Sequence, residues 1–130
     1  MSELKRKKVF YLAHPVSGDH VGNAFRAVEW IRWFAQNVPH LIVVAPWVAE
    51  VLAFPAKVPE GQVGSWDWAL ANDETVVAKL DGVITVGGRV SPGMQREVNA
   101  TLRAGGTYLD MSRYSIPGDV PEDFFIEEDI

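Results

Sequence analysis

The sequence predicts an α/β fold: a doubly wound (flavodoxin-like or Rossmann-like) parallel sheet of four to five strands with helices on both faces. Short runs of strand-forming residues alternate with longer segments of helical periodicity. The runs are apolar at nearly every position, as in strands that are covered on both faces. The length of 130 residues suits one core, so we expect residues 1–130 to form a single domain.

The first half of the chain supplies two predicted strands and a long helix. The strand at 9–13, VFYLA, ends at His14 and Pro15, and the strand at 41–46, LIVVAP, ends at Pro46. Between them a helix is predicted to run to residue 37 with Asn23 as its N-cap. Its apolar stripe consists of Phe25, Val28, Ile31 and Phe34, with Trp30 and Trp33 beside them. So wide a stripe predicts a helix that is partly core and partly subunit interface.

The second half continues the alternation. Residues 47–65 contain many prolines and glycines and are predicted to be a flexible loop or lid, with 47–54 able to form a short helix. A helix is then predicted over 66–80, ended by Asp81 and Gly82, followed by a strand at 83–86. A helix at 92–104 and a strand at 107–110 complete the pattern. The tail carries Phe124, Phe125 and Ile126, which we expect to dock on the body or on a neighbour.

Composition narrows the classes of function. Hydrophobic residues make up 48% and charged residues 22%, as in ordinary globular proteins. Twelve Lys and Arg against 17 Asp and Glu give a net charge of -5, which argues against a nucleic-acid partner. The chain has no cysteine and only three scattered histidines, so no metal site is predicted. The apolar run that follows the basic stretch 5–8 is too short for a secretory signal, and no run is long enough to span a membrane, so we expect a cytoplasmic protein.

In a doubly wound sheet the ligand crevice lies beyond the carboxyl ends of the strands, and two loops there have binding character. GGRVSPG, at 87–93, opens a helix whose free N–H groups favour an anion. The alternative for this loop is a tight turn with serine as the helix cap. HPVSGD, at 14–19, is similar, with donors for a second anion or a sugar hydroxyl. The candidate substrate-binding residues are His14, Ser17, Gly18, Gly88, Arg89, Ser91 and Gly93.

Three side chains are candidate catalytic residues. Glu97 follows the Gly-rich loop, and a carboxylate beside a crevice of low dielectric can attack a sugar anomeric carbon. Asp73 is the candidate for the second group, which protonates the leaving group. Tyr11, on the first strand, can orient a carboxylate with its hydroxyl. The alternatives are a surface glutamate, a helix-surface aspartate near Lys79 and a core tyrosine.

Three motifs in this order resemble the nucleoside 2-deoxyribosyltransferase superfamily, which includes the 2-deoxynucleoside 5-phosphate N-hydrolases. They are YLAHPVSG on the first strand, the spacing from Asp73 to DGVITV, and SPGMQRE. The likeness covers most of residues 9–110 and is closest to a small, often phage-borne branch of the superfamily. The resemblance implies a hydrolase (glycosidase) or transferase of nucleotide metabolism with no metal and no organic cofactor, active as a homodimer or higher homo-oligomer.

The resemblance also implies roles for individual residues. The glutamate of SxGxxxE, here Glu97, is the family's nucleophile and forms a covalent glycosyl intermediate. Asp73 matches the aspartate that assists protonation of the leaving base, and Tyr11 matches the tyrosine that holds the nucleophile. Ser91 matches the serine that contacts the 5-phosphate in the phosphohydrolase branch.

Two departures from the family pattern bear on the substrate. His14 stands where the family usually has glycine, and Ser17 stands where the phosphohydrolases carry an arginine; Arg89 is the candidate substitute. The leading hypothesis is cleavage or transfer of the N-glycosidic bond of a nucleoside or nucleoside 5-monophosphate by double displacement. The alternative is a non-catalytic nucleotide-binding module that uses the same crevice, with His14 blocking the productive pose.

Overall fold

The computed structural model describes residues 6–54 and 57–124, and it confirms the predicted fold class. Its four strands form one parallel sheet in the order β2-β1-β3-β4. The strands are β1 (Lys8–Ala13), β2 (Leu41–Val44), β3 (Gly82–Thr85) and β4 (Thr107–Asp110). The helices are α1 (His20–Asn37), α2 (Pro46–Ala53), α3 (Trp66–Val77) and α4 (Pro92–Arg103), followed by a short 3-10 turn, η1 (Pro117–Asp119).

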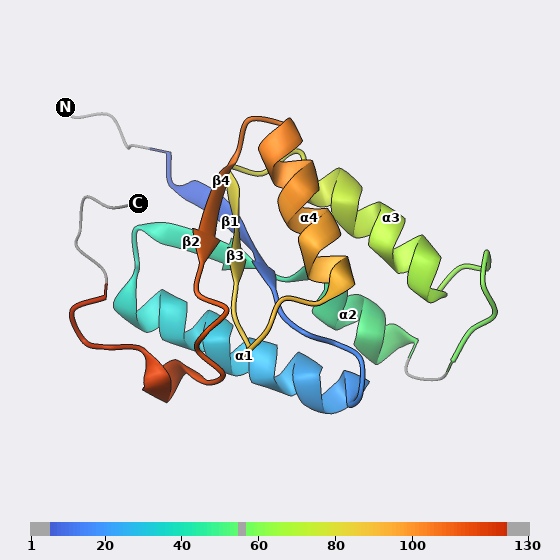
Figure 1. Cartoon of the computed structure of the whole chain (residues 1–130), viewed down its shortest axis with the longest axis horizontal. Helices are drawn as coiled ribbons and strands as arrows, with labels where there is room; N and C mark the ends of the chain where they lie inside the picture. The colour runs from blue at the N-terminus through green and yellow to red at the C-terminus, as the bar shows by residue number, and fades with distance from the viewer. Residues whose placement is uncertain (1–5, 55–56, 125–130) are drawn as a thin grey trace.

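The order in which successive strands are added to the sheet changes direction next to β1, although all strands run parallel. The chain passes from β1 to β2 on one side and then returns to β3 on the other side of β1. Because such crossovers are right-handed, α1 covers one face of the sheet while α3 and α4 cover the opposite face (Figure 1). Helix α2 contacts both α1 and α3. The reversal between β1 and β3 is the place where ligands bind in doubly wound sheets.

Strand β1 is the centre of the core. Phe10, Tyr11, Leu12 and Ala13 are all buried, as the continuous apolar run predicts for a strand covered on both faces. Side chains alternate along a strand, so Phe10 and Leu12 face one layer of helices and Tyr11 faces the other. The Tyr11 hydroxyl bonds to α4, which assigns Phe10 and Leu12 to the α1 side.

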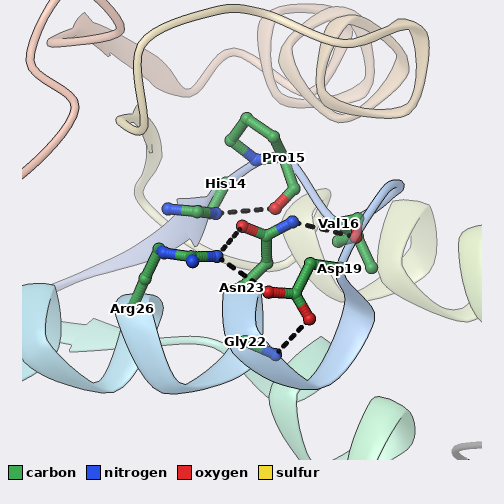
Figure 2. A network of polar contacts seen from close by, with 7 residues as sticks. All are labelled: His14, Pro15, Val16, Asp19, Gly22, Asn23 and Arg26. Carbon is green, nitrogen blue, oxygen red and sulfur yellow. Dashed lines mark hydrogen bonds and ion pairs between the residues drawn. The ribbon is translucent and has the colours of Figure 1, made fainter.

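The N-cap of α1 is Asp19, so the prediction of Asn23 as the cap is wrong. The Asp19 carboxylate accepts a hydrogen bond from the Gly22 N–H at 3.1 Å. Asn23 lies inside the helix, where its amide donates to the Val16 carbonyl at 3.0 Å and accepts from Arg26 at 2.9 Å (Figure 2). These bonds tie the loop after β1 to the first turn of α1, because the side chains point back toward that loop.

The buried stripe of α1 differs from the predicted one by about one position. Its buried residues are Ala24, Ala27, Trp30 and Phe34, whereas Phe25 is 59% exposed. Two alanines let the helix approach the sheet closely, and the large rings then fill the space on either side. The subunit interface that was expected of this helix stays a prediction.

Residues 47–65 were predicted to be a loop or lid in which 47–54 can form a short helix. Helix α2 (Pro46–Ala53) confirms that short helix. Pro46 starts this helix rather than only ending a strand, since proline is tolerated in the first turn. The next helix, α3, ends at Val77 and not at Asp81. Asp81 instead anchors the start of β1, because its carboxylate accepts from the Val9 N–H at 2.7 Å. Gly82 is accordingly the first residue of β3.

The tail passes from β4 back toward α1, where η1 packs. Phe124 packs edge-on against Tyr114 with ring centroids 5.5 Å apart, so this residue docks on the body as expected. Phe125 and Ile126 lie outside the described residues. No helix in the described part of the chain is long and apolar enough to cross a membrane.

Candidate active site

A cavity of about 540 Å³ opens at the carboxyl end of β1. Side chains of α2 and α3, the first turns of α4 and the loop after β1 line it. This is the crevice that the strand order predicts, and its volume lies in the range of small-molecule sites. Its walls are mainly apolar and aromatic, and its lining includes three carboxyl side chains: Glu50, Asp73 and Glu97.

Glu97 reaches the cavity from α4. Ser91 caps this helix by accepting from the Met94 N–H at 3.2 Å, and Pro92 occupies its first position. Glu97 is therefore nearly two turns into the helix, on its inner face, and only 6% exposed. Its Oε2 accepts a hydrogen bond from the Tyr11 hydroxyl at 2.5 Å. The structure thus joins two of the three predicted catalytic residues directly.

The electrostatics of this pair follow from burial. Burial raises the pKa of Glu97 to about 7, because the charged form loses hydration; the Tyr11 bond lowers that pKa, and the charges of Glu50 and Glu74 raise it further. Burial and the Glu97 charge also raise the pKa of Tyr11 well above its ordinary value. Tyr11 therefore keeps its proton and remains the donor to Glu97.

Asp73 lies on the inner face of α3, and it is 5% exposed. Burial raises the pKa of Asp73 far above the ordinary value for aspartate, and a hydrogen bond with the Glu50 carboxyl and the charges of Glu50 and Glu97 raise it further. A contact with the Tyr11 hydroxyl acts in the opposite direction. With its pKa raised so far, mainly by burial, Asp73 holds a proton at neutral pH.

Glu50 is the acidic residue that sequence reasoning missed. It is the only charged residue of α2, which otherwise reads as an apolar helix. A lone acid within an apolar run was the available signal, since such a charge is rarely buried without a partner or a function.

Aromatic side chains form the walls of the cavity. His14 and Trp47 stack with ring centroids 6.1 Å apart and planes inclined by 22°. The indole N–H of Trp47 donates to the Leu12 carbonyl at 2.8 Å, which fixes the ring at the end of β1. Phe54 and Trp68 meet edge to face at 5.7 Å. Flat rings at several points of the lining favour a flat ligand.

His14 is buried in the neutral form. Burial lowers its pKa, the Pro15 carbonyl opposes that effect, and the charges of Arg26 and Arg89 lower the pKa further. Nδ1 lies 2.6 Å from the Pro15 carbonyl, which only accepts, so Nδ1 carries the hydrogen (Figure 2). Nε2 is then an acceptor, and it is buried without a hydrogen-bond partner.

The predicted substrate-binding residues separate into two groups. His14, Ser17, Ser91 and Gly93 line the cavity, and Trp66 packs so closely over Gly93 that an added Cβ would lie 3.2 Å from its ring. Gly18, Gly88 and Arg89 lie outside the lining.

Gly88 has a reason of its own to be glycine. Its φ is 91°, and a Cβ there would come within 2.6 Å of the Ser115 hydroxyl oxygen. The Gly-rich turn after β3 therefore packs against the segment after β4. Arg89, which follows it, is exposed.

The acidic side chains are not arranged as a metal centre. Within residues 6–54 and 57–124, no group of three or more His, Asp or Glu side chains is placed to hold a metal ion. The arrangement instead offers one carboxyl held by a phenol, a second carboxyl paired with a third, and an aromatic enclosure.

The fold and the site together define a doubly wound α/β protein with a buried acidic cavity at the carboxyl edge of its sheet. Comparisons of the chain with models of protein families, with curated proteins and with solved structures find no match.

Proposed function

We propose that this protein cleaves or transfers the N-glycosidic bond of a nucleoside or nucleoside 5-monophosphate, as a member of the nucleoside 2-deoxyribosyltransferase superfamily. One observation carries the proposal: Tyr11 holds Glu97 beside a second buried acid, Asp73, in an apolar cavity. The two acids differ in their affinity for a proton, and pairs of this kind divide into acid and nucleophile.

Glu97 is the nucleophile in this proposal. A pKa of about 7 leaves a large fraction of Glu97 ionised at neutral pH, and the Tyr11 hydroxyl stabilises that ionised form. A Glu97 oxygen forms a bond to C1 of the sugar while the bond between C1 and the base nitrogen breaks. The electron pair of the broken bond stays on the base.

Asp73 is the proton donor to the departing base. Its high pKa keeps the proton available at neutral pH, and it lines the same cavity as Glu97. In the second half of the reaction a water molecule, or a second base, attacks C1 and displaces Glu97. Asp73, now ionised, takes up the proton that the attacking water loses. Asp73 is therefore protonated again at the end of each turnover.

The walls of the cavity suit the base. Trp47 and Trp68 offer aromatic surface, and a planar heterocycle gains from stacking on such surfaces. His14 lies stacked on Trp47, and about 540 Å³ remain beside the pair. At the rim, Ser17, Ser91 and Lys57 provide polar contacts for the sugar and for a phosphate when one is present.

The test is chromatography of the products after incubation with a panel of nucleosides and 5-monophosphates. The parent is expected to release free base, and Glu97→Gln to release at least ~10³-fold less, the usual scale for losing a covalent catalyst. Glu29→Gln, on the exposed face of α1, is the matched control and should equal the parent.

Equal base release by the parent and by Glu97→Gln would contradict the mechanism. Raised thermal stability with nucleotides but no free base from the parent would support the binding-module alternative, because a ligand that binds the native state stabilises it.

A further inference from the structure

Glu50 has no place in the mechanism above, yet it lies in the same cavity. It comes from α2, whereas Asp73 comes from α3, Glu97 from α4 and Tyr11 from β1. Glu50 is half-buried, and its Oε1 is enclosed without a hydrogen-bond partner. A carboxyl group in that position destabilises the fold unless another group shares its charge or its proton.

The partner is Asp73. The two residues line the same cavity from helices that contact each other, and one carboxyl oxygen of each, Oε1 of Glu50 and Oδ1 of Asp73, is buried there without a hydrogen-bond partner. Glu50 is also among the groups that raise the pKa of Asp73. The other groups that act on Asp73 are the carboxyl of Glu97 and the hydroxyl of Tyr11. The cationic side chain in the cavity lining is Lys57, which is exposed. Nearby, Glu74 of α3 forms an ion pair with Arg96 of α4, outside the cavity lining. The surroundings of Asp73 are therefore acidic.

Two neighbouring carboxyl groups hold their first proton more tightly than either group would alone, because ionising both places two like charges side by side. Proton donation by Asp73 requires that this proton be present before the base departs. Burial supplies part of the effect, and Glu50 adds both a hydrogen bond and a charge.

Building on the function proposed above, we propose that Glu50 is a positioning residue that keeps on Asp73 the proton which the departing base receives. When Asp73 has given up that proton, it stands as a carboxylate beside Glu50. The negative charge of Glu50 then raises the proton affinity of Asp73, which favours transfer of a proton from the attacking water to Asp73. Glu50 thus assists both half-reactions without contacting the sugar.

The first measurement is independent of activity. Infrared spectroscopy of protein labelled with carboxyl-¹³C aspartate reports the protonated carboxyl of Asp73, and Asp73→Asn identifies its band by removing it. In the parent the band is expected to persist above neutral pH. In Glu50→Gln its midpoint should fall by about two pH units, because the like charge and the shared proton are both lost. Glu29→Gln should leave it unchanged.

The second measurement is the pH profile of base release. In Glu50→Gln the alkaline limb should move to lower pH, with about a tenfold loss of activity on the alkaline side and little loss on the acidic side. Glu50→Asp keeps a carboxyl group and should recover part of the shift. A merely structural residue would lower activity at every pH alike.

The outcomes separate the two proposals. An unshifted infrared midpoint in Glu50→Gln, or an Asp73 band that is absent from the parent at neutral pH, overturns the role of Glu50. A midpoint that is shifted in Glu50→Gln, together with a parent that releases no base from any substrate, overturns the proposed function instead. If Glu50→Gln does not fold, Glu50→Ala removes the same carboxyl group, and its infrared midpoint decides between the same outcomes.

Discussion

The two sides of strand β1 are built from different chemistry. On the α1 side, Phe10 and Leu12 face Trp30 and Ala27, and all of these residues are apolar and buried. On the opposite side, one residue further along the strand, Tyr11 bonds to a buried glutamate. One side is an ordinary hydrophobic core, and the other contains ionisable groups where a core would normally be.

The two sides of β1 differ in what burial does to the stability of the fold. Burial of apolar area stabilises the fold, whereas burial of Asp73 and Glu97 destabilises their charged forms. A protein gains no stability from the charged forms of such acids, and buried acids of this kind in a cavity are typical of functional sites.

The largest effect on stability is expected on the α1 side. Trp30→Ala removes a fully buried ring and should lower the free energy of unfolding by ~4 kcal/mol, from lost burial and the cavity that remains. Urea denaturation measures it. Phe25→Ala, on the exposed face of the same helix, should change the value by less than ~0.5 kcal/mol. Equal effects from the two variants would contradict the assignment of the buried face.

On the Tyr11 side of β1, a substitution is expected to raise the free energy of unfolding rather than lower it. The folded pKa of Glu97 is about 7 against an ordinary value of 4.5, so the folded state binds this proton more tightly than the unfolded state does. Stability from this group is complete below its unfolded pKa and is lost as the pH rises through 7. Glu97→Gln should therefore be more stable than the parent by roughly 2–3 kcal/mol at alkaline pH.

Urea denaturation of Glu97→Gln and the parent across a pH series provides that measurement. The gap should close toward acidic pH, because Glu97 is then protonated in both states. A variant that is less stable than the parent at alkaline pH would show that the Glu97 carboxylate is better solvated than its burial implies.

A smaller effect is expected when the Tyr11 bond is removed. Tyr11→Phe takes away the donor that stabilises ionised Glu97, so the pKa of Glu97 should rise further. The acidic limb of the pH profile of base release should move up by about one pH unit, as for loss of one hydrogen bond to a charged group. If the acidic limb does not move, the Tyr11 hydroxyl does not stabilise the ionised form of Glu97.

The smallest effect on the free energy of unfolding is expected from removing the side chains that cap two helices. Ser91→Ala and Asp19→Ala each remove a side-chain acceptor at an N-terminus, and each should lower the free energy of unfolding by ~1 kcal/mol. Ser91 caps the helix that carries Glu97 and lines the cavity, so only its variant should also reduce base release from 5-monophosphates. Equal loss of activity in both variants would contradict this distinction.

The sequence predicted several residues that line the cavity, because the motifs lie where strands end and helices begin. The resemblance implied that Tyr11 holds Glu97, and the Tyr11 hydroxyl lies 2.5 Å from a Glu97 carboxyl oxygen in the structure. Glu50 was not predicted, since its pairing with Asp73 depends on how two helices pack across a proline- and glycine-rich segment. Asn23 was predicted as a cap, but Asp19 fills that position, because its carboxylate accepts a hydrogen bond from the Gly22 N–H.

The sequence by itself determined the order of strands and helices, because continuous apolar runs and helical periodicity are local signals. It also placed the crevice at one edge of the sheet. Only the tertiary structure decided which acids line the cavity together, which aromatic rings enclose it and which face of α1 is buried. The physical reason is that proton affinity and packing depend on distances between residues far apart in the chain, and no local pattern encodes those distances.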